Sequence, residues 1–155
     1  MSKFGKVINS RKQESVDCPP IYWVTKASKY GTYTCSVSPC SEDMDNINDW
    51  DGYRFAERKC DIKIVHAKAK VLKERANGIL NAHKALWDKY KSTKQYEAAP
   101  FLEDLYHQYE VAQKEYEKVY NQYKYMKNSF SDYTSRMIER RKKINKRITE
   151  KRKNK

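Results

Sequence analysis

The side chains with the clearest chemical potential are the cations at the end of the chain. Residues 136–155 hold 11 of the 33 Lys and Arg residues but only two acids, Glu139 and Glu150, so they carry most of the net charge of +13. Such a concentration suits docking on a polyanion; the alternative is a solvated helix end that contacts nothing. The side chains expected to contact phosphate groups are Arg136, Arg140, Arg141, Lys142, Lys143, Lys146, Arg147, Lys151 and Arg152.

Four cysteines are candidate metal ligands. Structural zinc sites usually contain two cysteines separated by two to four residues. Cys35 and Cys40 have four residues between them, whereas Cys18 and Cys60 have no near partner. Three states stay open: reduced, partly buried thiols, which the spacing favours; a zinc site formed by Cys18, Cys35, Cys40 and Cys60, or by three of them and a histidine; and disulfides. Disulfides are least expected, because the N-terminus lacks the apolar segment of a secretory signal. No other cofactor is expected.

An acidic run over residues 41–52 is similar to a calcium-binding loop only at first sight. The EF-hand pattern, started at Asp43, puts Asn48 where glycine is required and Arg54 where the terminal Glu is required. A solvated loop is therefore the expected structure of this run.

The sequence contains little that points to an enzyme. Its three histidines, His66, His83 and His107, are scattered along the chain. Cys60 and His66 are six residues apart, a spacing that places two helical side chains on different faces. The sequence has no Gly-rich phosphate loop, HExxH, G-x-S-x-G or paired-carboxylate signature, so we expect a protein that binds rather than catalyses.

Tyrosine is unusually frequent, with seven of 13 tyrosines between Tyr106 and Tyr133. Those on the predicted contact face of a helix are Tyr109, Tyr116, Tyr123 and Tyr133, and those beside or away from it are Tyr106, Tyr120 and Tyr125. Their spacing favours a packing role for the rings. One alternative is that the rings off this face stack on unpaired bases. The lysines nearby in sequence are Lys114, Lys118, Lys124 and Lys127. Another is that the rings anchor a protein partner.

Two long helices should position these groups. Apolar and aromatic side chains recur at alternating intervals of three and four residues over 52–94 and again over 100–138, which is typical of helices that face a partner. The first helix presents Phe55, Arg58, Ile62, Val65, Ala69, Leu72, Ala76, Ile79, His83, Leu86 and Tyr90. The second presents Leu102, Leu105, Tyr109, Ala112, Tyr116, Val119, Tyr123, Met126, Phe130, Tyr133 and Met137, and from Arg140 the same face is half charged. Gly78 inside the first helix is expected to allow a close contact or a bend.

The first 51 residues differ in composition from the helical part. β-branched and aromatic residues predict strands over 21–25 and 32–37, with a turn at 29–31 between them. Residues 1–16 have few apolar side chains and are expected to form an extended or mobile arm. Because a lone hairpin is marginal in water, this module should pack on the helices.

The predicted fold is therefore mainly α: a long, coiled-coil-like antiparallel helical hairpin with a small, cysteine-containing β-hairpin module at its N-terminal end. Its parts are the module over 1–51, the helices over 52–94 and 100–138, and a basic helical extension over 139–155. A short connection between long helices favours the antiparallel arrangement. No apolar run approaches the roughly 20 residues of a membrane-spanning helix, so we expect no membrane partner.

These features predict a non-enzymatic, nucleic-acid-binding accessory protein that contacts phosphates without reading bases. The alternative is a structural or regulatory subunit, or an inhibitor, of a larger protein or virion assembly, bound through the Tyr-rich hairpin. The partner is then nucleic acid or an acidic protein surface, within a homo- or hetero-oligomeric assembly. We expect a cytoplasmic, virion-associated or nucleoprotein-associated location rather than secretion. The richness in Lys, Asn and Tyr favours a phage or prokaryotic origin.

Overall fold

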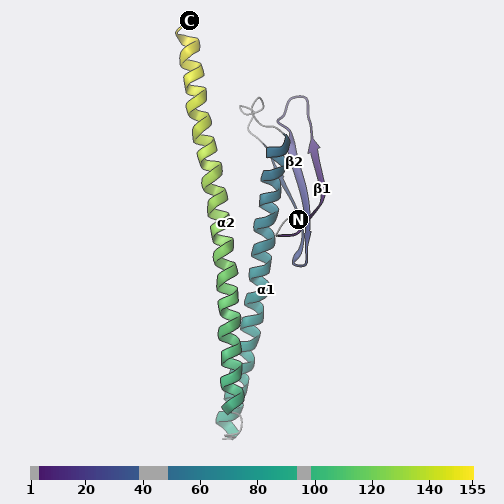
Figure 1. The fold of residues 1–155 in the computed structure, drawn as a ribbon, viewed down its shortest axis with the longest axis vertical. Helices are drawn as coiled ribbons and strands as arrows, with labels where there is room; N and C mark the ends of the chain where they lie inside the picture. Colours follow the sequence, from purple (N-terminus) through teal and green to yellow (C-terminus); the bar gives the residue numbers. More distant parts are fainter. Residues whose placement is uncertain (1–3, 39–48, 94–98) are drawn as a thin grey trace.

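The chain forms a small β-sheet followed by two long helices (Figure 1). The computed structural model describes residues 4–38, 49–93 and 99–155. The elements within these residues are β1 (Lys6–Gln13), β2 (Ile21–Ser28), β3 (Gly31–Val37), α1 (Asp49–Thr93) and α2 (Ala99–Lys153). The prediction of a mainly helical protein with a small N-terminal β module is confirmed.

The sheet has three antiparallel strands, in the order β1-β2-β3, rather than the two that the sequence predicts. Lys6–Gln13, expected to belong to an extended or mobile arm, pairs along β2, with Arg11 opposite Trp23 and Lys12 opposite Tyr22. This strand escaped prediction because it is mostly polar. An edge strand has a single neighbour and tolerates polar and charged side chains on both faces.

One face of the sheet packs on the first part of α1. Side chains alternate along β2, so that Tyr22, Val24 and Lys26 face the helix and are buried. Val24 and Cys35 contact Ala56 and Cys60 of α1 in a common core. The small side chains of α1 at this contact let the sheet approach the helix closely.

Lys26 is a charged residue in this otherwise apolar face. Its side chain is fully buried, and its Nζ donates hydrogen bonds to Glu57 Oε1, at 2.9 Å, and to Asp61 Oδ1. Burial lowers the pKa of Lys26, but the two carboxylates more than offset this effect and keep it above its ordinary value. Burial also raises the pKa of Asp61, which the ammonium group opposes. The module is thus attached to α1 by a buried ion pair network as well as by apolar contact.

The start of α1 is also tied to the sheet. Asp49 accepts a hydrogen bond from the Tyr22 hydroxyl at 2.8 Å and forms an ion pair with Lys12 at 2.9 Å. These two hydrogen bonds, from Lys12 first and Tyr22 second, lower the pKa of the Asp49 carboxyl. β1, β2 and α1 therefore meet at a single polar cluster.

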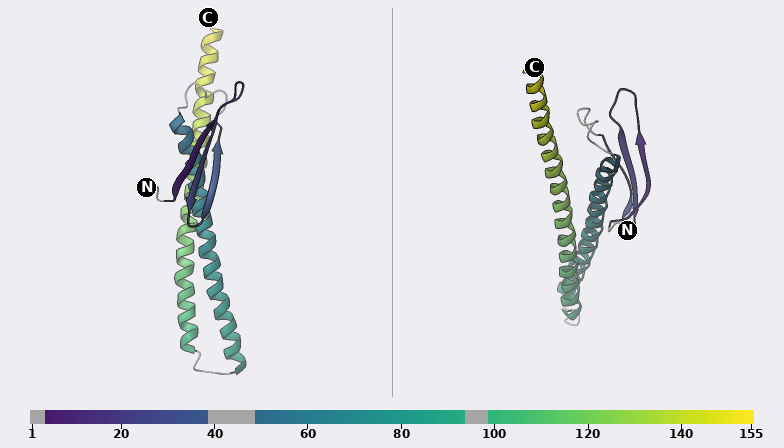
Figure 2. Two further views of the ribbon diagram at one scale, coloured as in Figure 1. Left: turned by 90° about the vertical axis from the view of Figure 1, so that its right-hand side faces the viewer. Right: turned by 45° about the horizontal axis from the view of Figure 1, so that its top comes forward.

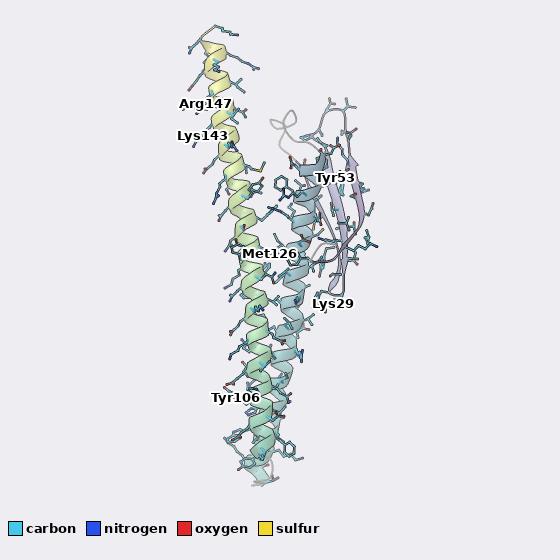
Figure 3. The ribbon with its side chains drawn as sticks, viewed as in Figure 1. Lys29, Tyr53, Tyr106, Met126, Lys143 and Arg147 are labelled. Carbon is cyan, nitrogen blue, oxygen red and sulfur yellow. The ribbon has the colours of Figure 1, made fainter. Side chains whose placement is uncertain are left out.

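The opposite side of α1 packs on α2, which runs back beside it in the antiparallel direction (Figures 1 and 2). Val65 and Ala69 contact Val119, with Leu72, Tyr116, Tyr123 and Met126 packed around them. Figure 3 shows Met126 on α2 directed toward α1. These residues belong to the two helix faces that the sequence predicts. Coiled-coil geometry stays a prediction.

Two glycines of α1 give a matched test of how the sheet packs on this helix. A Cβ at Gly52 would clash with the Tyr22 ring, whereas one at Gly78 would meet nothing within 4 Å among the described residues. The expected close contact at Gly78 is therefore wrong, and the alternative, a bend, stays a prediction. Gly78→Ala should raise the free energy of unfolding by about 1 kcal/mol, the helix propensity difference. Gly52→Ala should lower it, because the Tyr22 ring must move. Urea denaturation measures both, and a stabilising Gly52→Ala would contradict the sheet placement.

The buried network gives a second prediction. Lys26→Met keeps most of the side-chain bulk but leaves Glu57 and Asp61 without their cation, so it should cost about 3 kcal/mol of unfolding free energy. The loss should shrink at acidic pH, because protonated carboxyls need no cation. Lys63→Met, at an exposed position of α1, is the matched control. An equal, small effect of both substitutions would show that Lys26 is not buried against these acids.

Candidate polyanion-binding surface on α2

The C-terminal end of α2 extends beyond the N-terminal end of α1, so its last turns have no neighbouring helix among the described residues. Near the start of α1, the Phe55 ring lies 6.3 Å from that of Phe130 and 5.6 Å from that of Tyr133, measured between ring centroids. The helix then continues to Lys153, about 30 Å further at 1.5 Å per residue. Figures 1 and 2 show this end projecting beyond the sheet and α1.

The predicted phosphate contacts lie along this projecting end and do not gather in a pocket. Except for Arg141, whose side chain lies outside the described part of the chain, all of them are exposed. Five cations follow the spacing i, i+4, i+7, i+11 and i+15 and therefore share one side of the helix. They are Arg136, Arg140, Lys143, Arg147 and Lys151. Figure 3 labels Lys143 and Arg147 on this stretch of α2.

The charge of this row is not neutralised by nearby acids. Among the side chains that the structure describes, none of these five cations forms a salt bridge, whereas Lys12 and Lys26 do. The basic residues of the last turn, Lys151–Lys153, also oppose the partial negative charge of the helix C-terminus and stabilise it.

A second side of the same stretch is apolar. Met137, Ile144 and Ile148 continue the face that packs on α1, and Ile144 and Ile148 each remain 44% exposed. The projecting end therefore carries cations on more than one side, with the five aligned cations next to a narrow apolar stripe.

The structure separates the cysteines into two groups. Cys35 and Cys60 are buried beneath the sheet, and the Cys60 thiol donates to the carbonyl oxygens of Val24, at 3.3 Å, and Tyr33, at 3.4 Å. Burial, followed by the hydrogen bond with Cys35, raises the pKa of Cys60 to about 12. Cys18 is exposed between β1 and β2.

Cys40, the fourth predicted ligand, lies outside the described residues. Within the ranges that are described, no three His, Cys, Asp or Glu side chains form a group able to hold a metal ion. His66 stacks on Tyr123 of α2. Zinc binding stays a prediction.

A shallow apolar groove of about 630 Å³ lies where the two helices meet near their connection. It is lined by Leu80, His83 and Trp87 of α1 and by Leu102 and Tyr106 of α2. Trp87 and Tyr106 remain 41% and 46% exposed. This groove is the second candidate binding surface, at the opposite end of the molecule from the five aligned cations of α2.

Comparison with protein-family models, with curated proteins and with solved structures found no match for this chain. Over the described residues, neither helix has an apolar segment sufficient to cross a membrane.

The reactivity of Cys18 and Cys60 tests the core between the sheet and α1. At pH 8, iodoacetamide should modify Cys18 rapidly and leave Cys60 unmodified in the native protein, because a buried thiol with a raised pKa forms little thiolate. Peptide mass spectrometry with and without denaturant measures the modified fraction at each position. Equal modification of Cys18 and Cys60 in the native protein would contradict the sheet packing on α1.

Proposed function

We propose that the chain is a non-enzymatic accessory protein that binds nucleic acid through the basic row of α2, defined as Arg136, Arg140, Lys143, Arg147 and Lys151. The observation that carries the proposal is that these cations are exposed, lie on one side of a projecting helix and have no acidic partner among the described side chains. Such a protein would act in the cytoplasm or within a virion or nucleoprotein particle.

The physical basis is counterion release. The row extends over about 22 Å of helix, and duplex DNA carries one negative charge per roughly 1.7 Å of its axis, so cations rather than phosphates limit the number of contacts. Each contact releases condensed counterions, which makes the affinity depend strongly on salt. Phosphate contacts position a protein without reading sequence, which supports sequence-independent binding.

The helix pair would then act as a spacer between the basic end of α2 and the groove near the connection between the helices. Packing along a long, coiled-coil-like seam would keep α2 straight and hold its basic end away from the sheet. The groove near the connection between the helices lies far from the basic row (Figure 3 labels Tyr106 there).

The second candidate function is that of a structural or regulatory subunit, or an inhibitor, of a larger protein or virion assembly. The observation that favours it is the groove with its exposed Trp87 and Tyr106, because aromatic side chains in such positions are typical anchors of protein interfaces. In that case the basic row would contact an acidic protein surface.

Charge neutralisation tests the first proposal. Replacing Arg140, Lys143, Arg147 and Lys151 by Gln should weaken binding of a fluorescein-labelled oligonucleotide by about 100-fold at 50 mM salt, because four phosphate contacts are lost. Fluorescence anisotropy measures the dissociation constant, and circular dichroism should show an unchanged fold, since these positions lie past the contacts with α1.

The matched control removes the same charge elsewhere. Replacing the exposed Lys84, Lys89, Lys114 and Lys118 by Gln should weaken binding less than tenfold. Equal losses in both variants would show that only the net charge matters. If neither variant nor the wild-type chain binds at low salt, the protein-assembly function is the better account.

A further inference from the structure

We propose that one lateral face of the helix pair binds the unpaired bases of single-stranded nucleic acid. We call this face the aromatic–lysine strip; it consists of His66, Lys70 and Lys73 of α1 and Tyr116, Tyr120, Tyr123, Lys124 and Lys127 of α2. The inference rests on the proposed function and specifies its substrate class: a single strand in preference to a duplex.

The α2 half of the strip is a continuous set of rings. Tyr116 and Tyr120 stack with their centroids 5.6 Å apart and their planes 23° apart, and Tyr120 lies 6.0 Å from Tyr123. Tyr116, Tyr120 and Tyr123 all pack against the apolar core between the helices, which holds the rings in place. All three rings are only partly buried, so part of each remains open to a ligand.

The α1 half adds a fourth ring and further cations. The imidazole of His66 stacks on Tyr123, with centroids 4.4 Å and planes 16° apart, and its side chain is exposed. Lys73 Nζ lies 5.6 Å from the centre of the Tyr116 ring. Because His66 meets Tyr123 and Lys73 meets Tyr116 in antiparallel helices, the register places Lys70, between them, beside Tyr120.

Lysines cover the rings from both helices. Lys124 Nζ lies 5.0 Å from the Tyr120 ring centre and Lys127 Nζ 5.9 Å from that of Tyr123, in addition to Lys73 over Tyr116. The nearby acid Glu117, at the edge of the strip, accepts a hydrogen bond from Gln113 at 3.3 Å. The strip therefore combines partly exposed aromatic rings with an excess of positive charge.

This combination fits a single strand. Proteins that bind single strands without sequence preference use cations for the phosphates and aromatic rings for the bases. From Tyr116 to Lys127 the strip measures about 17 Å, enough for a few nucleotides. In a duplex the base faces are hidden in the stack, so the rings gain nothing. The same helix carries the basic row further on, and a strand of moderate length can contact both surfaces.

Only two of the four α2 lysines near these tyrosines in sequence belong to the strip. Lys124 and Lys127 lie against tyrosine rings, whereas the spacing of Lys114 and Lys118 places them on the far side of α2. Lys70, Lys73 and His66 come from α1 and can be assigned to the strip only once the helix register is known.

The test uses three fluorescein-labelled probes of equal length and the full chain: a single-stranded 15-mer, its duplex, and an abasic single strand with the same phosphates. The wild-type chain should bind the single strand at least tenfold more tightly than the abasic strand, because base–aromatic stacking is lost. Tyr120→Leu combined with His66→Leu should remove this preference and leave duplex binding unchanged. Tyr125→Leu, 74% exposed and off the strip, should change nothing.

The outcomes separate the two proposals. Equal affinity for the normal and abasic strands, or a duplex bound as tightly as the single strand, would overturn the strip and leave the basic row as the binding surface. Absence of binding to all three probes at low salt would overturn the strip and the proposed function together. A melting temperature of the double variant close to that of the wild-type chain ensures that lost preference reflects lost stacking.

Discussion

The rest of the structure depends on the ability of α1 to pack on two partners at once. One side carries Ala56 and Cys60, which are fully buried under the sheet, and another carries Val65 and Ala69, which are buried against α2. The sheet lies within residues 6–37, a unit too small to bury a sufficient core of its own. The buried Lys26, paired with Glu57 and Asp61, adds directional contacts to this interface. Since an uncompensated charge there would be costly, the network favours one placement of the sheet on the helix.

The basic end of α2 follows from a difference in length between the helices. α1 begins at Asp49, where Tyr22 and Lys12 fix it to the sheet, and α2 continues well beyond that level. The last ring contacts of α2 with α1 are those of Phe130 and Tyr133 with Phe55, and the apolar side chains that follow, Ile138, Ile144 and Ile148, are exposed. The cations begin where the core ends, so they can change without loss of the fold. Because packing and charge lie in different parts of α2, the projecting end is suitable as a binding element.

Sequence periodicity predicts much of this arrangement. Both helices follow from the apolar spacing, and so does the face with which each meets the other, because packing of long helices imposes a three-and-four repeat. The face of α1 that packs on the sheet was not predicted, because Ala56 and Cys60 lie outside that repeat. β1 was missed because a polar edge strand lacks an alternating pattern. The burial of Lys26 was missed because its partners lie 31 and 35 residues further along the chain. The aromatic–lysine strip was missed in part because the position of His66 beside Tyr123 depends on the register between the helices.

The central proposal is that α2 binds nucleic acid through exposed cations that have no acidic partner among the described side chains. Its most direct test is the salt dependence of the affinity of the full chain for a single-stranded oligonucleotide. If about five cations contact phosphates, the logarithm of the association constant should fall linearly with the logarithm of the salt concentration, with a slope of about −3 or steeper. Binding that is insensitive to salt, or no binding at 50 mM salt, would contradict this account and favour a protein partner for the same helix.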